Sequence, residues 1–357
     1  LSRQITATAS GAISAAGKSL VVNTDGTVSV VAITSETESV GSPTVFESAN
    51  TTKISTTFDS NSNKIVIAYR DDSNSYYGTA IVGTVSGTSI SFGSPVVFES
   101  AQVNDIAATF DSSNNKVVIA YTDNDNSSYG TAIVGTVSDT SISYGTPVVF
   151  ESAITSQVSA VFDSSNNKVV IAYRDHGNSS YGTAIVGTVS STSISFGSAS
   201  VFESATTDQI KTTFDSNSNK VVIVYRDQGN SDHGTVRVGT VSGTSISFGS
   251  TVVFYSTDTT TNGIAVTFDS NANKVVIAYT ADGSTSPFTG YGTAIVGTVS
   301  GTSISFGSAA VFESAYTSYI SATFDSNANK VVIAYKDSGN SQYGTAIAGT
   351  VSGTSIS

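Results

Sequence analysis

The chain has 357 residues, a formal net charge of −12, and no Cys, Met or Trp. Its acidic balance argues against a nucleic-acid partner, which needs a basic footprint, and against binding to an anionic membrane surface. The lack of cysteine excludes disulfides, thiol nucleophiles and Cys-ligated metal centres. No apolar run reaches the roughly 18 residues of a membrane span, so we expect no membrane insertion.

The first 49 residues diverge from the rest of the chain. Residues 1–10 are expected to form a closing strand or linker, with residues 4–9 (QITATA) as the strand. Residues 11–49 are expected to form a compact, diverged repeat unit, because residues 26–49 align without a gap to residues 78–101. Within this unit, residues 18–23 (KSLVVN) stand where later repeats have KIVIAY.

Residues 50–357 consist of six near-identical repeats of about 52 residues. The repeating blocks begin at a glycine, and these glycines are Gly41, Gly93, Gly145, Gly197, Gly249 and Gly307. A period of this size indicates one supersecondary unit that is stacked many times. Any function is therefore to be sought in the positions that differ between copies.

Each repeat reads as four short strands that alternate with turns. In the copy that starts after residue 50, the strands are expected at 54–58, 64–69, 78–85 and 90–98, with turns or loops at 59–64, 70–77 and 86–89. The segment 64–69 (KIVIAY) is nearly all apolar, which favours burial on both faces. Four antiparallel strands in roughly 50 residues are typical of a β-propeller blade.

The sequence predicts an all-β fold: a single domain over residues 1–357 that forms a seven-bladed β-propeller. The diverged unit supplies the seventh blade, and the N- and C-terminal strands pair to close the ring, because the last repeat stops at Ser357 in the middle of its fourth strand. Such pairing covers two strand edges that would otherwise be open. The alternative is six blades with an N-terminal arm.

Variable residues gather in the loop after the second strand, which shares one face with the ESA connections between repeats. Loops on a rigid scaffold are where binding residues are often found. Arg, Asp and Tyr suit sugar recognition, through hydrogen bonds and through stacking on the ring. The candidate ligand-binding residues are Arg70, Asp71, Tyr76, Tyr129, Arg174, Asp175, His176, Tyr181, Arg226, Asp227, Phe288, Tyr291, Lys336 and Asp337.

A structural role competes for the same residues. Each Arg and Asp can pair with the other, or with the next blade, to hold the loop, and each Tyr before the recurring Gly can be a packing residue. The opposite face carries the nearly invariant DSNSNK turn. There Asp59, Asn61 and Asn63 echo the oxygen-ligand spacing of a calcium loop, but other copies break this spacing, which favours an ordinary hairpin turn.

The sequence argues against an enzyme and predicts no cofactor. A nucleophilic triad needs a base, and the two histidines, His176 and His233, lie in different repeats. The recurring Asp residues stand in register in most repeats, which favours an architectural role.

The order ISTTFDSNSNKIVIAYRD…GTAIVGTVSGTSISFGSPVVFES resembles the blades of sialidase-like propellers. The resemblance implies the propeller fold. It does not imply the sialidase activity, because the Asp-box pattern S-x-D-x-G-x-T-W is missing from every copy and the catalytic residues of that family have no counterparts here. A glycoside hydrolase therefore remains a remote alternative.

The opening GAISAAGKSLVVNTDGTVSVV and the tandem VVFESA…FDSNSNKVVIAYRD units look like surface repeat proteins of marine phages, including cyanophages, and of aquatic bacteria. This resemblance implies a non-catalytic adhesion module on a virion, associated with a phage tail or capsid, or on a cell surface. The expected partner is a glycan or another structural or surface protein, and the expected location is extracellular or on the virion surface. The alternative is a purely structural decoration or spacer that docks in a larger oligomeric assembly.

Overall fold

The structure is a computed structural model that describes residues 20–22, 27–30, 41–256, 263–282 and 290–357. The chain divides into two compact units, Leu1–Pro43 and Thr44–Ser357, and each is described by itself. Apart from two 3-10 turns, η1 (His176–Asn178) and η2 (Gln228–Asn230), every regular element in the described ranges is a strand. No helix there is long and apolar enough to cross a bilayer.

The larger unit contains six consecutive antiparallel sheets. Sheet 1 consists of β3 (Thr51–Asp59), β4 (Lys64–Asp71), β5 (Tyr77–Ser86), β6 (Ser89–Phe92) and the first part of β7 (Val96–Asp111). Sheet 2 consists of the rest of β7, β8 (Lys116–Asp123), β9 (Tyr129–Ser138), β10 (Ser141–Tyr144) and the first part of β11 (Val148–Asp163). Sheet 3 consists of the rest of β11, β12 (Lys168–Asp175), β13 (Tyr181–Ser190), β14 (Ser193–Phe196) and the first part of β15 (Ser200–Asp215).

The next three sheets repeat this plan with changes. Sheet 4 consists of the rest of β15, β16 (Lys220–Asp227), β17 (His233–Ser242), β18 (Ser245–Phe248) and β19 (Val252–Tyr255). Sheet 5 consists of β20 (Ile264–Asp269), β21 (Lys274–Asp282), β22 (Gly290–Ser300), β23 (Ser303–Phe306) and the first part of β24 (Ala310–Asp325). Sheet 6 consists of the rest of β24, β25 (Lys330–Asp337) and β26 (Tyr343–Gly349), and the chain ends in the hairpin of β27 (Val351–Ser352) and β28 (Ser355–Ile356).

At four of the five junctions between the six sheets, one continuous strand runs through the ESA connection, where no strand was predicted. The first part of β7 pairs with β5 on the outer edge of sheet 1, and its second part pairs with β8 as the inner strand of sheet 2. The segment carries no Gly or Pro that would break it, so the backbone passes from one sheet to the next in extended form. β-Bulges shift its pairing register with β5 along the way. β11, β15 and β24 do the same.

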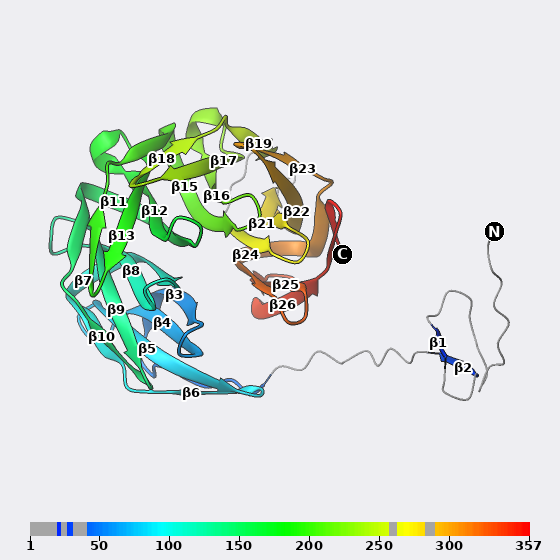
Figure 1. Cartoon of the computed structure of the whole chain (residues 1–357), viewed down its shortest axis with the longest axis horizontal. Coiled ribbons are helices and arrows are strands. Elements are labelled where there is room, and N and C mark those ends of the chain that lie inside the picture. Colours follow the sequence, from blue (N-terminus) through cyan, green and yellow to red (C-terminus); the bar gives the residue numbers. More distant parts are fainter. Residues whose placement is uncertain (1–19, 23–26, 31–40, 257–262, 283–289) are drawn as a thin grey trace. The chain divides into compact units, whose positions relative to one another are not determined.

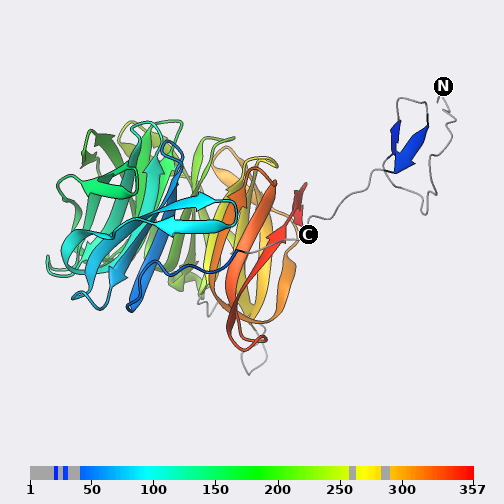
Figure 2. The ribbon, with the colours of Figure 1, turned by 90° about the horizontal axis from the view of Figure 1, so that it is seen from below.

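The six sheets stand around a common centre, with each inner strand next to the inner strand of the following sheet (Figure 1). The strands run between two opposite faces, as the view turned by 90° shows (Figure 2). We call the face with the hairpin turns that start at Asp59 and its equivalents the turn face. The loop face carries the loops between the second and third strands of the sheets, at residues 71–77, 123–129, 175–181, 227–233 and 337–343.

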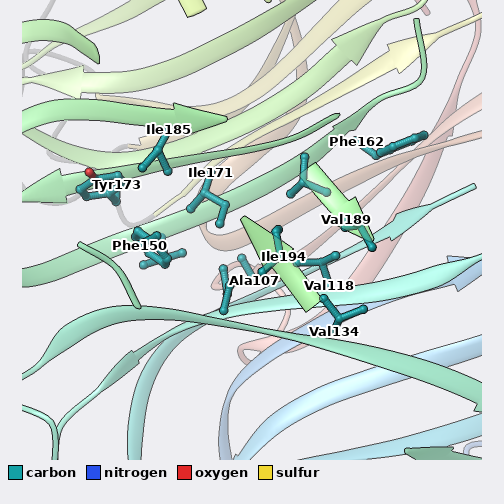
Figure 3. Packing of buried hydrophobic residues seen from close by; sticks show 14 residues of the cluster. Ala107, Val118, Val134, Phe150, Phe162, Ile171, Tyr173, Ile185, Val189 and Ile194 are labelled. Carbon is teal, nitrogen blue, oxygen red and sulfur yellow. The ribbon is translucent and has the colours of Figure 1, made fainter. Parts of the chain in front are cut away.

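An aromatic pair joins each sheet to the next. Phe150, on the outer strand of sheet 2, packs against Tyr173 of sheet 3 with ring centroids 5.2 Å apart, and the same contact recurs at the other junctions. Around it, Ile171, Ile185 and neighbouring residues form a core cluster between the sheets (Figure 3). The apolar core of the segment 64–69 and of its equivalents in sheets 2 to 5 is buried on both faces, as the sequence predicts, whereas Ala334 in sheet 6 is exposed.

In the smaller unit, β1 (Leu20–Val22) and β2 (Val28–Val30) form an antiparallel pair in which Val22 lies opposite Val28. The gap-free alignment of residues 26–49 with residues 78–101 makes this pair equivalent to Ala68 opposite Ala80, which β4 and β5 form. The sequence alignment and the strand register therefore agree over the described part of this unit. The expected strand at residues 4–9 lies outside the described residues.

Candidate functional site

The recurring aspartates of the loop face hold the backbone of their own loops. Asp71 accepts hydrogen bonds from the backbone N–H groups of Ser73 and Asn74, at 3.1 Å each. Asp175 caps the 3-10 turn η1, and equivalent bonds recur at the corresponding carboxylates, which are Asp123, Asp227 and Asp337. Three of the four predicted aspartates, Asp175, Asp227 and Asp337, are buried. They shape the loops and do not present free carboxylates to a ligand.

Each of these loops contains two consecutive residues in the left-handed region, although none of the residues is glycine. The pairs are Ser75–Tyr76, Ser127–Ser128, Ser179–Ser180, Ser231–Asp232 and Ser341–Gln342, with φ between 53° and 63°. Such conformations are uncommon outside glycine and are maintained where the surrounding structure enforces them. The loops are therefore defined turns that present their side chains in fixed positions.

The strand register corrects one predicted tyrosine. Tyr77 lies opposite Asp71, just as Tyr129, Tyr181 and Tyr343 lie opposite their aspartates, whereas Tyr76 is one residue earlier. The sequence already places Tyr77, and not Tyr76, before the recurring Gly, since Tyr76 stands where the next copy has Ser128. Tyr291 and Tyr343 are exposed, Tyr129 and Tyr181 are half-buried, and Phe288 lies outside the described residues.

Arg70 occupies a junction that is filled by its own neighbours. Its Nε donates to Oδ1 of Asp72 at 2.7 Å, and Nη1 donates to Oδ1 of Asn104 on the next sheet. Its guanidinium also lies 5.1 Å from the centre of the Tyr76 ring. The hydrogen bond from Arg70 is the main reason that the pKa of Asp72 is lowered. This arginine locks sheet 1 to sheet 2.

Arg174 occupies the equivalent junction between sheets 3 and 4 and is about as exposed as Arg70, but it lacks the short carboxylate contact that Arg70 has. Nε donates to Ser156 Oγ at 3.0 Å and Nη1 donates to the carbonyl of Thr207 at 3.3 Å, whereas the nearest Asp208 oxygen is 3.8 Å away. The position after Asp175 is His176 and not an acidic residue, so no short carboxylate contact saturates the guanidinium.

His176 extends this junction toward solvent. Its Nε2 lies 2.8 Å from Ser156 Oγ, and its Nδ1 lies 3.2 Å from Ser180 Oγ. Burial and the charge of Arg174 lower the pKa of His176 below its usual value. At neutral pH the ring is therefore uncharged, with one nitrogen able to donate and the other able to accept a hydrogen bond.

Asp208 links Arg174 to Arg226 on the following sheet, since each guanidinium lies 3.8 Å from one of its oxygens. Arg226 also forms an ion pair with Asp232 at 2.9 Å. The structure thus brings Arg174, His176 and Arg226 into one polar cluster, which we call the Arg174 cluster together with Ser156, Ser180 and Asp208. Arg70 and Lys336 lie elsewhere, and the ammonium of Lys336 is 6.0 Å from the centre of the Tyr319 ring.

Two junctions have a threonine in place of the basic residue. Thr122 and Thr280 are buried, and each hydroxyl donates to a backbone carbonyl of the next sheet, at Thr155 and Thr317. These copies keep the contact between sheets and present no charge. The loop-face positions are therefore not equivalent.

The turn at Asp59 has the hydrogen bonds of a hairpin turn. Asp59 Oδ1 accepts from the backbone N–H groups of Asn61 and Ser62, and Oδ2 accepts from Ser62 Oγ. Asn63 adopts φ 58°, which closes the turn. Within the described ranges, no group of three or more His, Asp or Glu side chains is placed to hold a metal ion.

A partly buried tyrosine–glutamate pair, which was not predicted from the sequence, recurs between sheets. The hydroxyl of Tyr173 donates to Glu151 at 3.0 Å, and the same bond joins Tyr69 to Glu47, Tyr121 to Glu99, Tyr225 to Glu203 and Tyr335 to Glu313. Burial raises the pKa of these tyrosines, that of Tyr335 to about 12. The glutamate that recurs in the ESA segments is the sequence feature that could have indicated this pair.

A ring of residues at the start of the inner strands was also missed. Lys53, Asp105, Gln157, Gln209 and Tyr319 all have φ between 44° and 58°. Asp105 accepts from the backbone N–H of Gln157 at 3.0 Å, and Gln157 Oε1 accepts from the N–H of Gln209 at 3.1 Å. The residue type varies between copies, with Lys, Asp, Gln, Gln and Tyr in turn, so no single residue type marks this ring in the sequence.

No protein-family model matches the chain, and no curated protein matches its sequence. Solved structures do resemble it. The AofleA protein of Arthrobotrys oligospora, solved unmodified and as a variant with three arginines changed to alanine, superposes with a TM-score of 0.53 at 8% identity, covering 85% of this chain and 84% of that one.

A second solved structure, of the lectin SapL1 in complex with alpha methyl fucoside, gives a TM-score of 0.52 at 15% identity. It covers 85% of this chain and 94% of that one. At these identities the likeness concerns the fold. The structure is an all-β repeat fold of antiparallel sheets, which a propeller-like architecture fits.

Proposed function

We propose that this protein is a non-catalytic carbohydrate-recognition module and that the Arg174 cluster is its principal sugar-binding site. The observation that carries the proposal is the open junction at Arg174, where a guanidinium, an uncharged imidazole, two hydroxyls and a carboxylate converge on one face. The corresponding junction at Arg70 is filled by Asp72 and Asn104.

The chemistry of the cluster suits a sugar. Neighbouring hydroxyls of a pyranose both donate and accept hydrogen bonds. Arg174 offers planar, directed donors and Asp208 offers an acceptor, and His176 holds the hydroxyls of Ser156 and Ser180 through its two ring nitrogens. The left-handed loop residues keep these groups in place, so that little ordering is needed on binding.

The structural neighbours support a sugar as the ligand. SapL1 was solved with alpha methyl fucoside bound, and AofleA was solved with three arginines replaced, in a sequence where those arginines recur at a regular interval. We therefore take alpha methyl fucoside as the first probe. A non-enzymatic role is favoured because the recurring carboxylates Asp175 and Asp227 are committed to loop backbone.

The experiment compares Arg174→Ala with Arg70→Ala by a glycan array and by titration calorimetry of the best ligand. Losing a hydrogen bond from a charged group costs about 1.5–3 kcal/mol, so Arg174→Ala should weaken binding at least tenfold. Arg70→Ala should lower the melting temperature but leave the affinity within about twofold, because it removes a lock between sheets.

Equal loss of affinity in both variants would contradict the assignment to the Arg174 cluster. A blank array with well-folded protein would contradict carbohydrate recognition itself. It would favour the alternative, a structural module within a larger assembly. Attachment to a virion or cell surface stays a prediction from the sequence resemblance.

Ring closure by a seventh sheet is part of the proposal. Equivalent side chains differ in exposure between the end sheets and the inner sheets: Phe58 of sheet 1 is 53% exposed against 9% for Phe162, and Ile54 is 51% exposed against 1% for Ile210. On sheet 6, Ile347 is 37% exposed against 3% for Ile185. Apolar faces of this kind need a cover. We assign that cover to the diverged repeat unit of residues 11–49, in which β1 and β2 pair in the register of β4 and β5.

A further inference from the structure

A cavity of about 530 Å³ runs through the centre of the larger unit, away from the Arg174 cluster. Its wall is formed by the inner strands of all six sheets and is largely small or polar, including Ser55, Ala107, Ser159, Ala265 and Ser321. A volume of this size falls in the range of small-molecule binding sites.

One residue breaks the symmetry of this wall. The small residues just named occupy the same register position in their sheets, opposite Ala68 and its equivalents, and sheet 4 has Lys211 there instead. A long, charged side chain thus projects into a space that five other copies keep open. Repetition alone explains the small residues, but it does not explain the lysine.

The side chain of Lys211 is solvent-exposed, and the solvent that it meets is that of the central cavity, whose wall it lines. Among the residues that the structure describes, no ion pair or hydrogen bond is formed by its ammonium. Removal from bulk water is the main reason that its pKa is lowered, and the charge of Lys53 adds to this. The charge of Asp105 partly offsets this, and an anion bound beside the ammonium would favour its charged form further.

The nearest acidic group is already engaged. Lys211 shares a smaller recess of about 160 Å³ with Lys53, Asp105 and Gln157. Asp105 forms an ion pair with Lys53 at 3.2 Å and accepts from the backbone of Gln157. The recess therefore holds two ammonium groups for one carboxylate, a local positive charge in a chain of net charge −12.

We propose that the central cavity binds a small, hydroxyl-rich organic anion, whose carboxylate or phosphate pairs with Lys211. Ser159 and Thr212, 2.9 Å apart on neighbouring inner strands, and Ser55 supply hydroxyls for the uncharged part of the ligand. An ion pair that is shielded from bulk water is stronger than one on the surface. The chemistry fits a hexuronic acid or a sugar phosphate.

The test compares the full chain with its Lys211→Ser variant. Serine is chosen because Ser159 occupies the equivalent position in sheet 3, so the fold already accommodates serine there. Sodium glucuronate, inorganic phosphate and neutral glucose are titrated by calorimetry and by melting temperature at constant ionic strength. We expect glucuronate or phosphate to bind the unmodified protein at millimolar concentration or below and to raise its melting temperature. The Lys211→Ser substitution should weaken the affinity for the anion tenfold or more. Glucose should neither bind measurably nor raise the melting temperature in either protein.

Two controls separate this site from others. Lys116→Ala removes a lysine of the turn face and should leave anion binding unchanged. Arg174→Ala removes the sugar site and should also leave it unchanged, so failure of one proposal does not imply failure of the other. The inference is overturned if neither anion binds, or if Lys211→Ser binds them as well as the unmodified protein does.

Discussion

At the scale of residues, the fold relies on side chains that join one sheet to the next. The tyrosine of the second strand makes two such contacts. Its ring packs on a phenylalanine of the preceding sheet, and its hydroxyl donates a hydrogen bond to a glutamate of the strand that connects the two sheets. One copy departs from this rule, since Tyr255 stands where the others have glutamate and packs on Tyr279 with ring centroids 5.1 Å apart. The pair is therefore a structural joint, which each copy satisfies in its own way.

Tyr173→Phe should lower the free energy of unfolding by about 1–3 kcal/mol, because it leaves the carboxylate of Glu151 without its buried donor. Urea unfolding followed by circular dichroism measures the change. Tyr279→Phe serves as the control, since its neighbour is a tyrosine and not a carboxylate, and its cost should be smaller. Equal costs would show that the hydroxyl–carboxylate bond contributes little.

At the scale of elements, glycines allow side chains to cross closely packed strands. A Cβ at Gly182 would lie 2.4 Å from Cε2 of Phe202, which is fully buried, whereas nothing lies within 4 Å of the equivalent Gly344 in sheet 6. The same residue at the same position of the repeat thus has a packing role in one sheet and none in the other. The recurring YG step in the sequence does not distinguish the two cases.

Gly182→Ala should therefore destabilise the protein by about 1–3 kcal/mol through overpacking against Phe202. Gly344→Ala should be neutral or slightly stabilising if this side of sheet 6 is open, because alanine restricts the unfolded chain, and should be destabilising if the proposed seventh sheet packs against it. Melting temperatures of both variants test this. A comparable loss in Gly344→Ala would mean that sheet 6 has a neighbour against this position.

The strands were predictable because alternation, turn residues and repetition all point to the same register. The site was predictable only in part. The residue types of the loop face identified Arg174 and Arg226, but their grouping around Asp208 depends on how neighbouring sheets meet. Whether an arginine is saturated, as Arg70 is, or open, as Arg174 is, depends on the residue two positions later and on the next sheet. Alignment of the repeats already places Lys211 where other copies have Ser or Ala, but only the structure shows that this position lines the central cavity.

At the scale of the whole molecule, the two end sheets differ from the four between them. Side chains that are buried in the inner sheets are exposed on sheets 1 and 6, although the sequence of the repeats hardly changes. The number of sheets that close the ring stays a prediction. Its physical basis is the need to cover Phe58 and Ile347, together with the register of β1 and β2.

Phe58→Ala in the full chain tests this closure. If a seventh sheet covers Phe58, the substitution should cost about as much as Phe162→Ala, on the order of 3–5 kcal/mol for a buried phenylalanine. Equilibrium unfolding of both variants gives the comparison. A cost below about 0.5 kcal/mol for Phe58→Ala, as for ordinary surface positions, would show that the face is open and would favour an external partner there.

The strands shared between successive sheets also bear on how such a chain changes over generations. The boundary between sheets falls inside β7, β11, β15 and β24, where no loop has to be cut or rejoined. A tandem duplication or deletion of one repeat length, wherever it begins, therefore adds or removes one whole sheet and creates only junctions that already exist. Copy number can vary in whole steps, while point changes such as those at Thr122, Arg174 and Lys211 accumulate in individual copies.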